Sequence, residues 1–554
     1  MLDALFLSAR EEGLRDVSRR TLHRLKHVTP LHTHRALGMV MNFAKIGPGT
    51  RDPSANRLLQ YAGILQRHPT TWPDSPRLDP LPWGAGLIPS NAEIPKGLAG
   101  PWPQAPVVDD QLYAPVLNLD ANEVRQHVRD NVLRYMGQAA VLVGPAALRA
   151  KRGPRLVALD DATFMRILVD TAFAQFICRR LDPVDLERFG RYIGSSPEEF
   201  VKVDASGLQS QATLPGMFCV QTVMLLRRIT PGRLTPVAIA LENRVVEPAD
   251  GPAWELARYF VLQGLNYLLV IMFHPRLHFP NDIVNAVTRT LLPREHVLHK
   301  LLEPFLELTL GLHAAVIHHR RSVLHNSQRE IYTPFPVTTE GIHASVAVGR
   351  NGLSGNSAFL PYRWGDAWMD PEFAYGRFRR DWHDATLAMT SDVLAHVPAD
   401  DPLVLQWAEA IHAWLPSFPD ADEIVRPGVL ARAVTYFILA GSVFHTGDHH
   451  SYSSIPLERI PWRLRRGPLV AGESGPLELD ALVTVEDFFR HQLCHAMFFA
   501  PAVLRSLREV RWRFNDSALQ GAVRAFRKRM DELDRCWQGS NFPQSHQIAS
   551  SAQY

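Results

Sequence analysis

The stretch Phe273-His274-Pro275-Arg276-Leu277-His278 decides how this chain of 554 residues is interpreted. Its two histidines are four residues apart, a spacing that places both imidazoles on one face of a helix, where they can bind one metal ion. A second pair with the same spacing, His445 and His449, lies in the stretch 444–450, FHTGDHH. Together the two pairs predict that two helices supply four histidines to one metal centre.

The surroundings of each histidine pair separate candidate ligands from accidental spacings, because the chain has 24 histidines. The pairs at 274/278 and 445/449 each end a strongly apolar segment, which predicts that both are buried. A buried imidazole without a partner is costly, and one shared metal ion would satisfy all four rings. Core histidines with ordinary hydrogen bonds are the alternative. Two further pairs are interpreted as surface or structural residues: His23/His27 and His491/His495.

The composition is that of an ordinary globular protein, with 46% hydrophobic and 21% charged residues. A net charge of +3 with interspersed signs predicts no nucleic-acid partner. The four cysteines show no CxxC spacing and are expected to be core thiols. No secretory signal is recognisable, so a cytoplasmic protein is expected. The basic face around Arg19 and Arg24 leaves peripheral membrane contact open, although a solvated helix face is the favoured interpretation.

The hydrophobic period predicts a mainly α protein. Helices are expected to begin near Asp120 and at Asp160-Asp161, and to cover 254–278, 293–321, 377–397, 403–415, 429–449, 488–507 and 516–537. Residues 214–241 change to a strand-like pattern with a turn at Pro231-Gly232, which predicts a small β-hairpin. Residues 69–117 are rich in proline and glycine and are expected to form an extended arm. We therefore predict an N-terminal helical and extended segment, 1–117, and one large helical catalytic domain, 118–554.

From about residue 155 onward, the order of landmarks resembles the lipoxygenase family. The segments that carry the resemblance are 160–164 (DDATF), 214–216 (LPG), 234–241 (LTPVAIAL), 254–258 (WELAR), 296–304 (HVLHKLLEP), 442–449 (SVFHTGDH) and 548–554 (IASSAQY). The resemblance implies a non-haem iron dioxygenase, with manganese as the alternative metal. Such an enzyme abstracts hydrogen from a polyunsaturated fatty acid or similar polyene and adds O2 to give a hydroperoxide. The partners implied are an apolar small molecule and O2.

The resemblance also implies which residues bind the metal: His274, His278, His445, His449 and the main-chain carboxylate of Tyr554. His278 stands at the family's distance before the 296–304 landmark. His274 fits an H-x3-H spacing, as in manganese-type members, because Phe273 occupies the position that the commoner H-x4-H spacing requires. His450 is the rival of His449 as fourth ligand.

Several departures from the family's pattern suggest other functions. Pro275 removes a helix hydrogen bond beside His274 and predicts a kinked or loosened turn there. Val316 stands where the family usually has Gly or Ala, and is expected to narrow the oxygen-access side of the substrate pocket. Tyr554 replaces a terminal isoleucine. The first 110 residues lack the alternating strands of the family's N-terminal lipid-binding β-barrel, as in some bacterial-type members.

These departures motivate two alternative functions. One is a diverged oxygenase of specialised metabolism that acts on a non-fatty-acid substrate. The other is a metal-free lipid-binding or scaffold protein that kept the fold. The sequence predicts no oligomeric state.

Overall fold

The computed structural model of the protein describes residues 153–205, 212–306, 335–342, 345, 369–413, 415, 417–469, 476–495 and 506–552, and the statements below concern these residues. The predicted N-terminal segment 1–117 lies outside them, as does the boundary predicted at residue 118.

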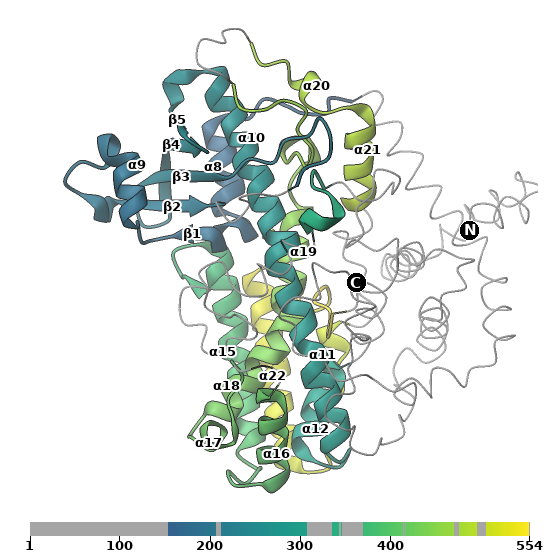
Figure 1. Cartoon of the computed structure of the whole chain (residues 1–554). Helices are drawn as coiled ribbons and strands as arrows, with labels where there is room; N and C mark the ends of the chain where they lie inside the picture. The colour runs from purple at the N-terminus through teal and green to yellow at the C-terminus, as the bar shows by residue number, and fades with distance from the viewer. Residues whose placement is uncertain are drawn as a thin grey trace, which may run out of the picture.

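Most of the described chain is helical, and the prediction of a mainly α fold with a small β-structure is confirmed (Figure 1). The α-helices are α8 (Asp161–Val169), α9 (Pro183–Ile193), α10 (Pro252–Tyr267), α11 (His274–Leu291), α12 (Val297–Leu302), α15 (Ala374–Leu394), α16 (Pro402–His412), α17 (Ala421–Ile424), α18 (Val429–Leu439), α19 (His445–Ser453), α20 (Leu479–Leu482), α21 (Val485–Cys494) and α22 (Ser517–Cys536). Two π-helical segments are η6 (Leu268–Phe273) and η9 (Ala440–Phe444).

Side-chain caps explain where several helices begin. Asp160 caps α8, since its carboxylate accepts the Thr163 N–H at 2.6 Å, as predicted from the Asp-Asp pair. The helix expected from Pro293 begins instead at Val297, because the ring of His296 accepts the Leu298 N–H at 3.2 Å. The part of that predicted helix beyond residue 306 lies outside the described ranges.

The predicted hairpin forms the centre of a larger sheet. The strands are β1 (Ile177–Cys178), β2 (Phe200–Asp204), β3 (Thr222–Thr230), β4 (Arg233–Leu241) and β5 (Arg244–Val246), in the order β1-β2-β3-β4-β5 and all antiparallel. The turn between β3 and β4 contains Gly232 at a φ of +74°, which glycine adopts without strain. Residues 217–220, expected in the first strand, lie before β3 and outside it.

The sheet buries both of its faces, with alternate residues on opposite sides. Leu225 and Ala238 pack with Phe189 of α9, whereas Met224 and Ile239 belong to the main hydrophobic core. The main core also includes the apolar side chains of α10 and α18. The sheet therefore covers one end of the helical body, as Figure 1 shows.

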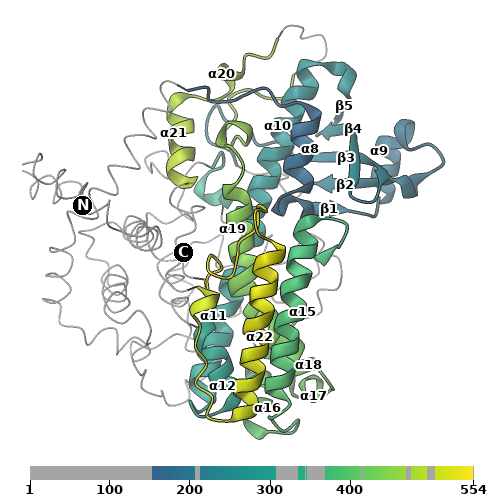
Figure 2. The ribbon, with the colours of Figure 1, turned by 180° about the vertical axis from the view of Figure 1, so that it is seen from behind.

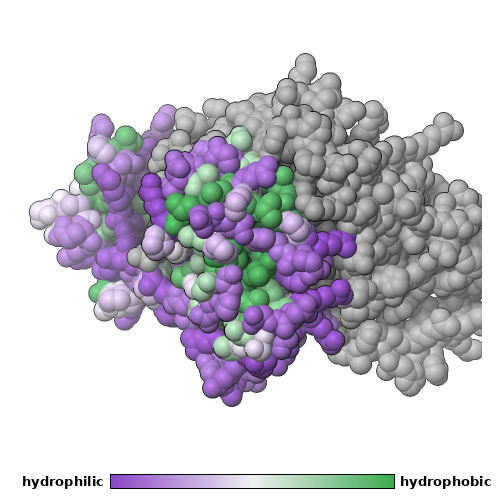
Figure 3. All heavy atoms as spheres, turned by 90° about the horizontal axis from the view of Figure 1, so that it is seen from below, coloured by the Kyte–Doolittle hydropathy of each residue, from purple (hydrophilic) through white to green (hydrophobic). Residues whose placement is uncertain are grey.

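The long helices form a bundle below the sheet. From behind, α22 runs beside α15, with α11 and α12 on its other side (Figure 2). The packing of α15 against both α18 and α22 agrees with this view. From below, the end of the bundle shows apolar side chains in the middle of a largely hydrophilic rim (Figure 3).

Two continuous helical stretches run through the core, and both are longer than the sequence predicted. They are Pro252–His278, which continues to Leu291, and Val429–Ser453. By length and composition alone each is apolar enough to cross a membrane. However, 89% of each apolar window is buried inside the protein, and helices that are apolar all round are expected in the core of a large domain.

Candidate metal centre

Each core stretch changes to π-helix for about one turn just before its first candidate ligand. Segment η6 ends at Phe273 and α11 begins at His274, while η9 ends at Phe444 and α19 begins at His445. A π-helical turn is rare and frequently occurs at functional sites. The same irregularity therefore stands at the same place in both histidine-bearing helices.

Pro275 lies at the change from π-helix to α-helix. The His274 N–H bonds to the carbonyl of Leu269, five residues earlier, and Pro275 has no N–H with which to continue either register. The N–H that Pro275 lacks is thus missing at the position where i,i+5 bonding gives way to i,i+4 bonding. The loosening that the sequence predicted is present as η6, before His274, and α11 continues after it.

The four histidines meet in antiparallel register between the two helices. Nε2 of His445 lies 3.0 Å from Nε2 of His278, and Nε2 of His449 lies 2.7 Å from Nε2 of His274. The ligand atoms of all four lie within 4.8 Å of one another. Metal–nitrogen bonds of about 2.1 Å place neighbouring ligand atoms about 3 Å apart. The spacing of the imidazole nitrogens therefore suits one shared ion.

The donor chemistry of this group fits a first-row transition metal. Neutral imidazole nitrogens suit iron, manganese, copper or zinc, and each ring can offer one lone pair. His445 and His449 are buried, and His274 is partly exposed. The four-histidine group can therefore hold a metal ion. His450, the predicted rival of His449, is not a member of the group.

The predicted fifth ligand, Tyr554, and the predicted pocket residue, Val316, both lie outside the described residues. The chain just before the terminus packs against the metal-candidate helix α19. Residues 548–552 are buried, and the Ala549 N–H donates to Thr446 Oγ1 at 3.0 Å. The described end of the chain is thus tied to the residue next to His445.

A glycine lets the side chain of Asn281 in α11 approach η9 closely. A Cβ added at Gly441 would lie 3.0 Å from Nδ2 of Asn281 and 3.9 Å from the backbone nitrogen of Ala552. Asn281 follows His278 by about one turn of α11. A small residue at position 441 therefore allows α11 and η9 to pack closely beside the candidate ligands, with the C-terminal segment in ordinary contact.

Asp448 is a buried carboxylate beside the four histidines. Sequence reasoning missed this residue. Its Oδ1 accepts hydrogen bonds from Arg379 at 3.0 Å, from Gln175 at 3.3 Å and from the Tyr375 hydroxyl. Its Oδ2 lies 4.0 Å from Nδ1 of His274. Burial alone would raise the pKa of Asp448, but Arg379, His274 and Tyr375 hold it below the ordinary value. The available signal was an acidic residue between the two candidate ligands His445 and His449, at the end of a long apolar stretch.

The pair His491/His495 belongs to a different cluster, and His491 is a core residue, in line with the structural interpretation. Its Nε2 lies 3.2 Å from the Tyr452 hydroxyl, which also accepts the Trp462 indole N–H at 2.8 Å. Burial, with a smaller effect of His495, lowers the pKa of His491 well below 6.5. His491 is therefore neutral and satisfied by hydrogen bonding.

The fold and the four-histidine group define the class: a lipoxygenase-like helical domain with a candidate non-haem metal centre. Solved lipoxygenases share the fold. A LOX deletion variant gives a TM-score of 0.61 at 15% identity, over 75% of this chain and 73% of that chain. A calcium-dependent 11R-lipoxygenase gives a TM-score of 0.59 at 15% identity, over 73% of this chain and 67% of that chain. A coral 8R-lipoxygenase gives a TM-score of 0.57 at 16% identity, over 71% of this chain and 66% of that chain.

No family model matches the sequence, and no curated protein matches it. At 15–16% identity the likeness to the solved structures establishes the lipoxygenase-like fold. The predicted resemblance is confirmed at that level. The bacterial-type and manganese-type assignments stay predictions.

Proposed function

We propose that this protein is a lipoxygenase-like non-haem metal dioxygenase that converts a polyunsaturated fatty acid, or a similar polyene, to a hydroperoxide. The observation that carries the proposal is the convergence of four imidazole Nε2 atoms from two buried helices, with facing pairs 2.7 and 3.0 Å apart. The lipoxygenase-like fold supports it.

In this proposal the metal ligands are His274, His278, His445, His449 and the main-chain carboxylate of Tyr554. An iron or manganese ion bound there would supply the one-electron chemistry that hydrogen-atom abstraction and the use of O2 require. The protein holds the imidazoles on rigid core helices, and its buried surroundings keep bulk water from the reacting carbon. An apolar pocket would bind the acyl chain and select the carbon that is presented.

Metal analysis combined with an activity assay tests the proposal. Purified protein is analysed for iron and manganese and is then offered linoleic or arachidonic acid while conjugated-diene absorbance is followed. We expect stoichiometric metal and diene formation, both lost in His445→Gln. If the folded, unmutated protein held neither iron nor manganese, even after incubation with these ions, the proposed dioxygenase function would be contradicted. A metal-free lipid-binding or scaffold protein would then be favoured.

A diverged oxygenase acting on a non-fatty-acid substrate is the second candidate. The departures from the family's pattern at Pro275, Val316 and Tyr554 motivate it. A metal-loaded protein that gives no diene with either fatty acid, but consumes O2 with other polyenes, would support this candidate over the first.

The remaining expectations accompany the proposal and can be measured separately. They are a cytoplasmic location, no nucleic-acid partner and, for the basic N-terminal face, peripheral membrane contact. Co-sedimentation of the full chain with anionic vesicles would test the membrane contact directly.

A further inference from the structure

The hydrogen bonds to Asp448 are distributed unevenly between its two oxygens. Arg379 Nη2, Gln175 Nε2 and the Tyr375 hydroxyl all donate to Oδ1. Oδ2 is directed instead towards Nδ1 of His274, 4.0 Å away. The three donors therefore orient the carboxylate so that its second oxygen faces a candidate metal ligand.

The groups that hold Asp448 are themselves rigid. Arg379 is completely buried, donates to the Tyr375 hydroxyl at 2.9 Å, and lies 4.3 Å from the ring centroid of Tyr375 and 4.7 Å from that of Phe444. Aromatic faces attract a guanidinium, and a buried carboxylate needs such a partner. Rotation of Asp448 away from His274 would break several of these contacts together.

We propose that Asp448 is a positioning residue that fixes the tautomer of His274. At 4.0 Å, Oδ2 is too far from Nδ1 of His274 for a direct hydrogen bond, but its negative charge favours a proton on that nitrogen. Nε2 then carries the lone pair and points at Nε2 of His449, 2.7 Å away. The ring is thus prepared to bind a metal ion through Nε2. A carboxylate beside the remote ring nitrogen of a histidine ligand orients the ring and raises its basicity.

The same carboxylate would act on a bound metal ion through its charge, and this part of the inference rests on the proposed function. A negative charge near the ion stabilises the oxidised form more than the reduced form. Asp448 would therefore lower the reduction potential of an ion bound there, while Arg379 would offset part of that effect. Removal of the charge on Asp448 is expected to raise the potential.

Asp448→Asn tests the proposal because the hydrogen-bond donors dictate how the new amide is oriented. Three donors surround the Oδ1 position, so the amide oxygen takes that place and the NH2 group faces His274. Two donors cannot face each other, so His274 must move its proton from Nδ1 to Nε2. That proton would then occupy the direction in which a metal binds.

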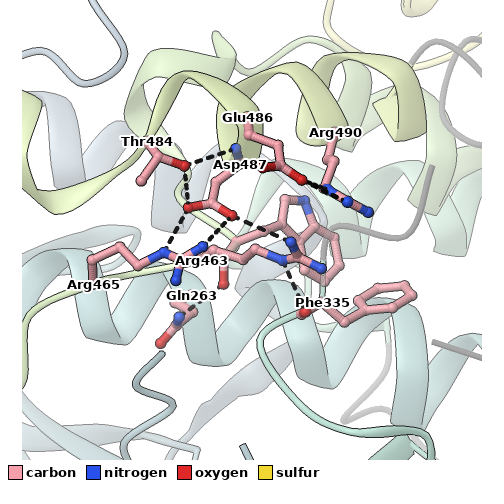
Figure 4. A network of polar contacts seen from close by, with 9 residues as sticks. Gln263, Phe335, Arg463, Arg465, Thr484, Glu486, Asp487 and Arg490 are labelled. Carbon is pink, nitrogen blue, oxygen red and sulfur yellow. Dashed lines mark hydrogen bonds and ion pairs between the residues drawn. The ribbon is translucent and has the colours of Figure 1, made fainter. Parts of the chain in front are cut away.

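Asp487 provides a matched control, shown in Figure 4. It is buried like Asp448 and accepts hydrogen bonds from Arg463 at 3.2 Å, from Arg465 at 2.7 and 2.9 Å, and from the Thr484 hydroxyl at 2.6 Å. Those partners include no histidine. Asp487→Asn therefore removes a buried, arginine-paired charge without changing the environment of a candidate ligand.

The first measurement uses metal-free protein labelled with ¹⁵N-histidine, in which imidazole ¹⁵N shifts report each tautomer and His274→Gln assigns the signal. We expect the Nδ1–H tautomer at His274 in the parent and in Asp487→Asn, and the Nε2–H tautomer in Asp448→Asn. An unchanged tautomer in folded Asp448→Asn would overturn the proposal. This outcome does not depend on whether the protein binds a metal.

The second measurement uses iron-loaded protein. Asp448→Asn should bind Fe²⁺ about 10–100-fold more weakly in a chelator competition, with a raised reduction potential, while Asp487→Asn changes neither. If Asp448 had only a structural role, both variants would lose thermal stability, but the Fe²⁺ affinity and the reduction potential would stay unchanged. That result would refute the proposed effect of Asp448 on the metal ion. If Asp448→Asn does not fold, Asp448→Asn/Arg379→Gln removes both charges of the pair; the same change of tautomer at His274 is expected, with a smaller rise in potential.

Discussion

Pro275 follows His274 in the chain and Asp448 faces it in space, so two neighbours constrain one imidazole. The proline removes a backbone donor where η6 gives way to α11, and the carboxylate faces Nδ1 of the ring. Neither neighbour involves Nε2, which is directed at His449. The ring is therefore constrained from its backbone and from its far nitrogen, with Nε2 turned towards the candidate metal site.

Removal of a single candidate ligand should eliminate stoichiometric metal binding. In His445→Gln the atom that lies 3.0 Å from His278 Nε2 is lost, and three imidazoles remain. We expect iron bound to the purified variant to fall at least tenfold, measured by elemental analysis. His491→Gln is the control, because His491 is buried but contacts Tyr452 instead of the group. Equal metal content in both variants would exclude His445 as a ligand.

The stability of the protein should decrease on mild acidification because of His491. Burial lowers its pKa well below the usual 6.5, so below pH 6.5 the unfolded chain binds a proton that the folded chain does not. The contribution of neutral, buried His491 to the free energy of unfolding is therefore complete above pH 6.5, and it declines as the pH falls below that value. Urea unfolding of the metal-free protein between pH 7.5 and 5.5 should show a smaller loss for His491→Gln than for the parent.

At the scale of elements, α19 packs against α15 through a glycine that separates two candidate ligands. A Cβ added at Gly447 would lie 3.2 Å from Phe378 Cε1 and 3.2 Å from the Tyr375 hydroxyl. Tyr375 is held by Asp448 and Arg379 and cannot move away freely. The close approach of the two helices thus depends on the absence of a side chain.

Gly447→Ala should therefore lower the free energy of unfolding by about 1–3 kcal/mol, the usual effect of overpacking a core. It should also weaken metal binding, since the added methyl group displaces Tyr375 from Asp448. Gly190→Ala in α9 is the control, because an added Cβ there meets nothing within 4 Å. It should stabilise the protein by about 0.5–1 kcal/mol and leave metal binding unchanged. Chemical denaturation and chelator competition measure both effects; comparable stability of the two variants would contradict the close-packing argument.

The long helices and the four histidines were predictable because apolar period and i,i+4 spacing are local properties of the sequence. The strands β1, β2 and β5 were missed, since runs of two to five residues carry little period and their pairing depends on partners elsewhere. At Pro275 the sequence predicted a loosened turn but not its π-helical form, and η9 was missed altogether, because a shift to i,i+5 bonding changes no residue type. Asp448 was missed because its main partner, Arg379, is 69 residues away in the sequence and is brought there by α15.

At the scale of the whole molecule, distant parts of the chain meet at the candidate metal centre. The facing pairs join residues 167 and 175 positions apart, and the segment 548–552 packs on the same helix. Such contacts form only when the large core has assembled. The site is therefore a product of the folded domain, and metal binding is expected to stabilise the whole domain, because the folded chain alone presents the four imidazoles together.

The C-terminus gives the sharpest test of the complete ligand set. If the main-chain carboxylate of Tyr554 is a ligand, deletion of the last residue should abolish metal binding, because the new terminus is one residue too short to reach the ion. Tyr554→Ile keeps a main-chain carboxylate at the same position and should retain stoichiometric iron. Elemental analysis compares the two, and circular dichroism verifies that both are folded. Undiminished iron in the deletion variant would show that the four histidines suffice and that the terminal carboxylate is no ligand.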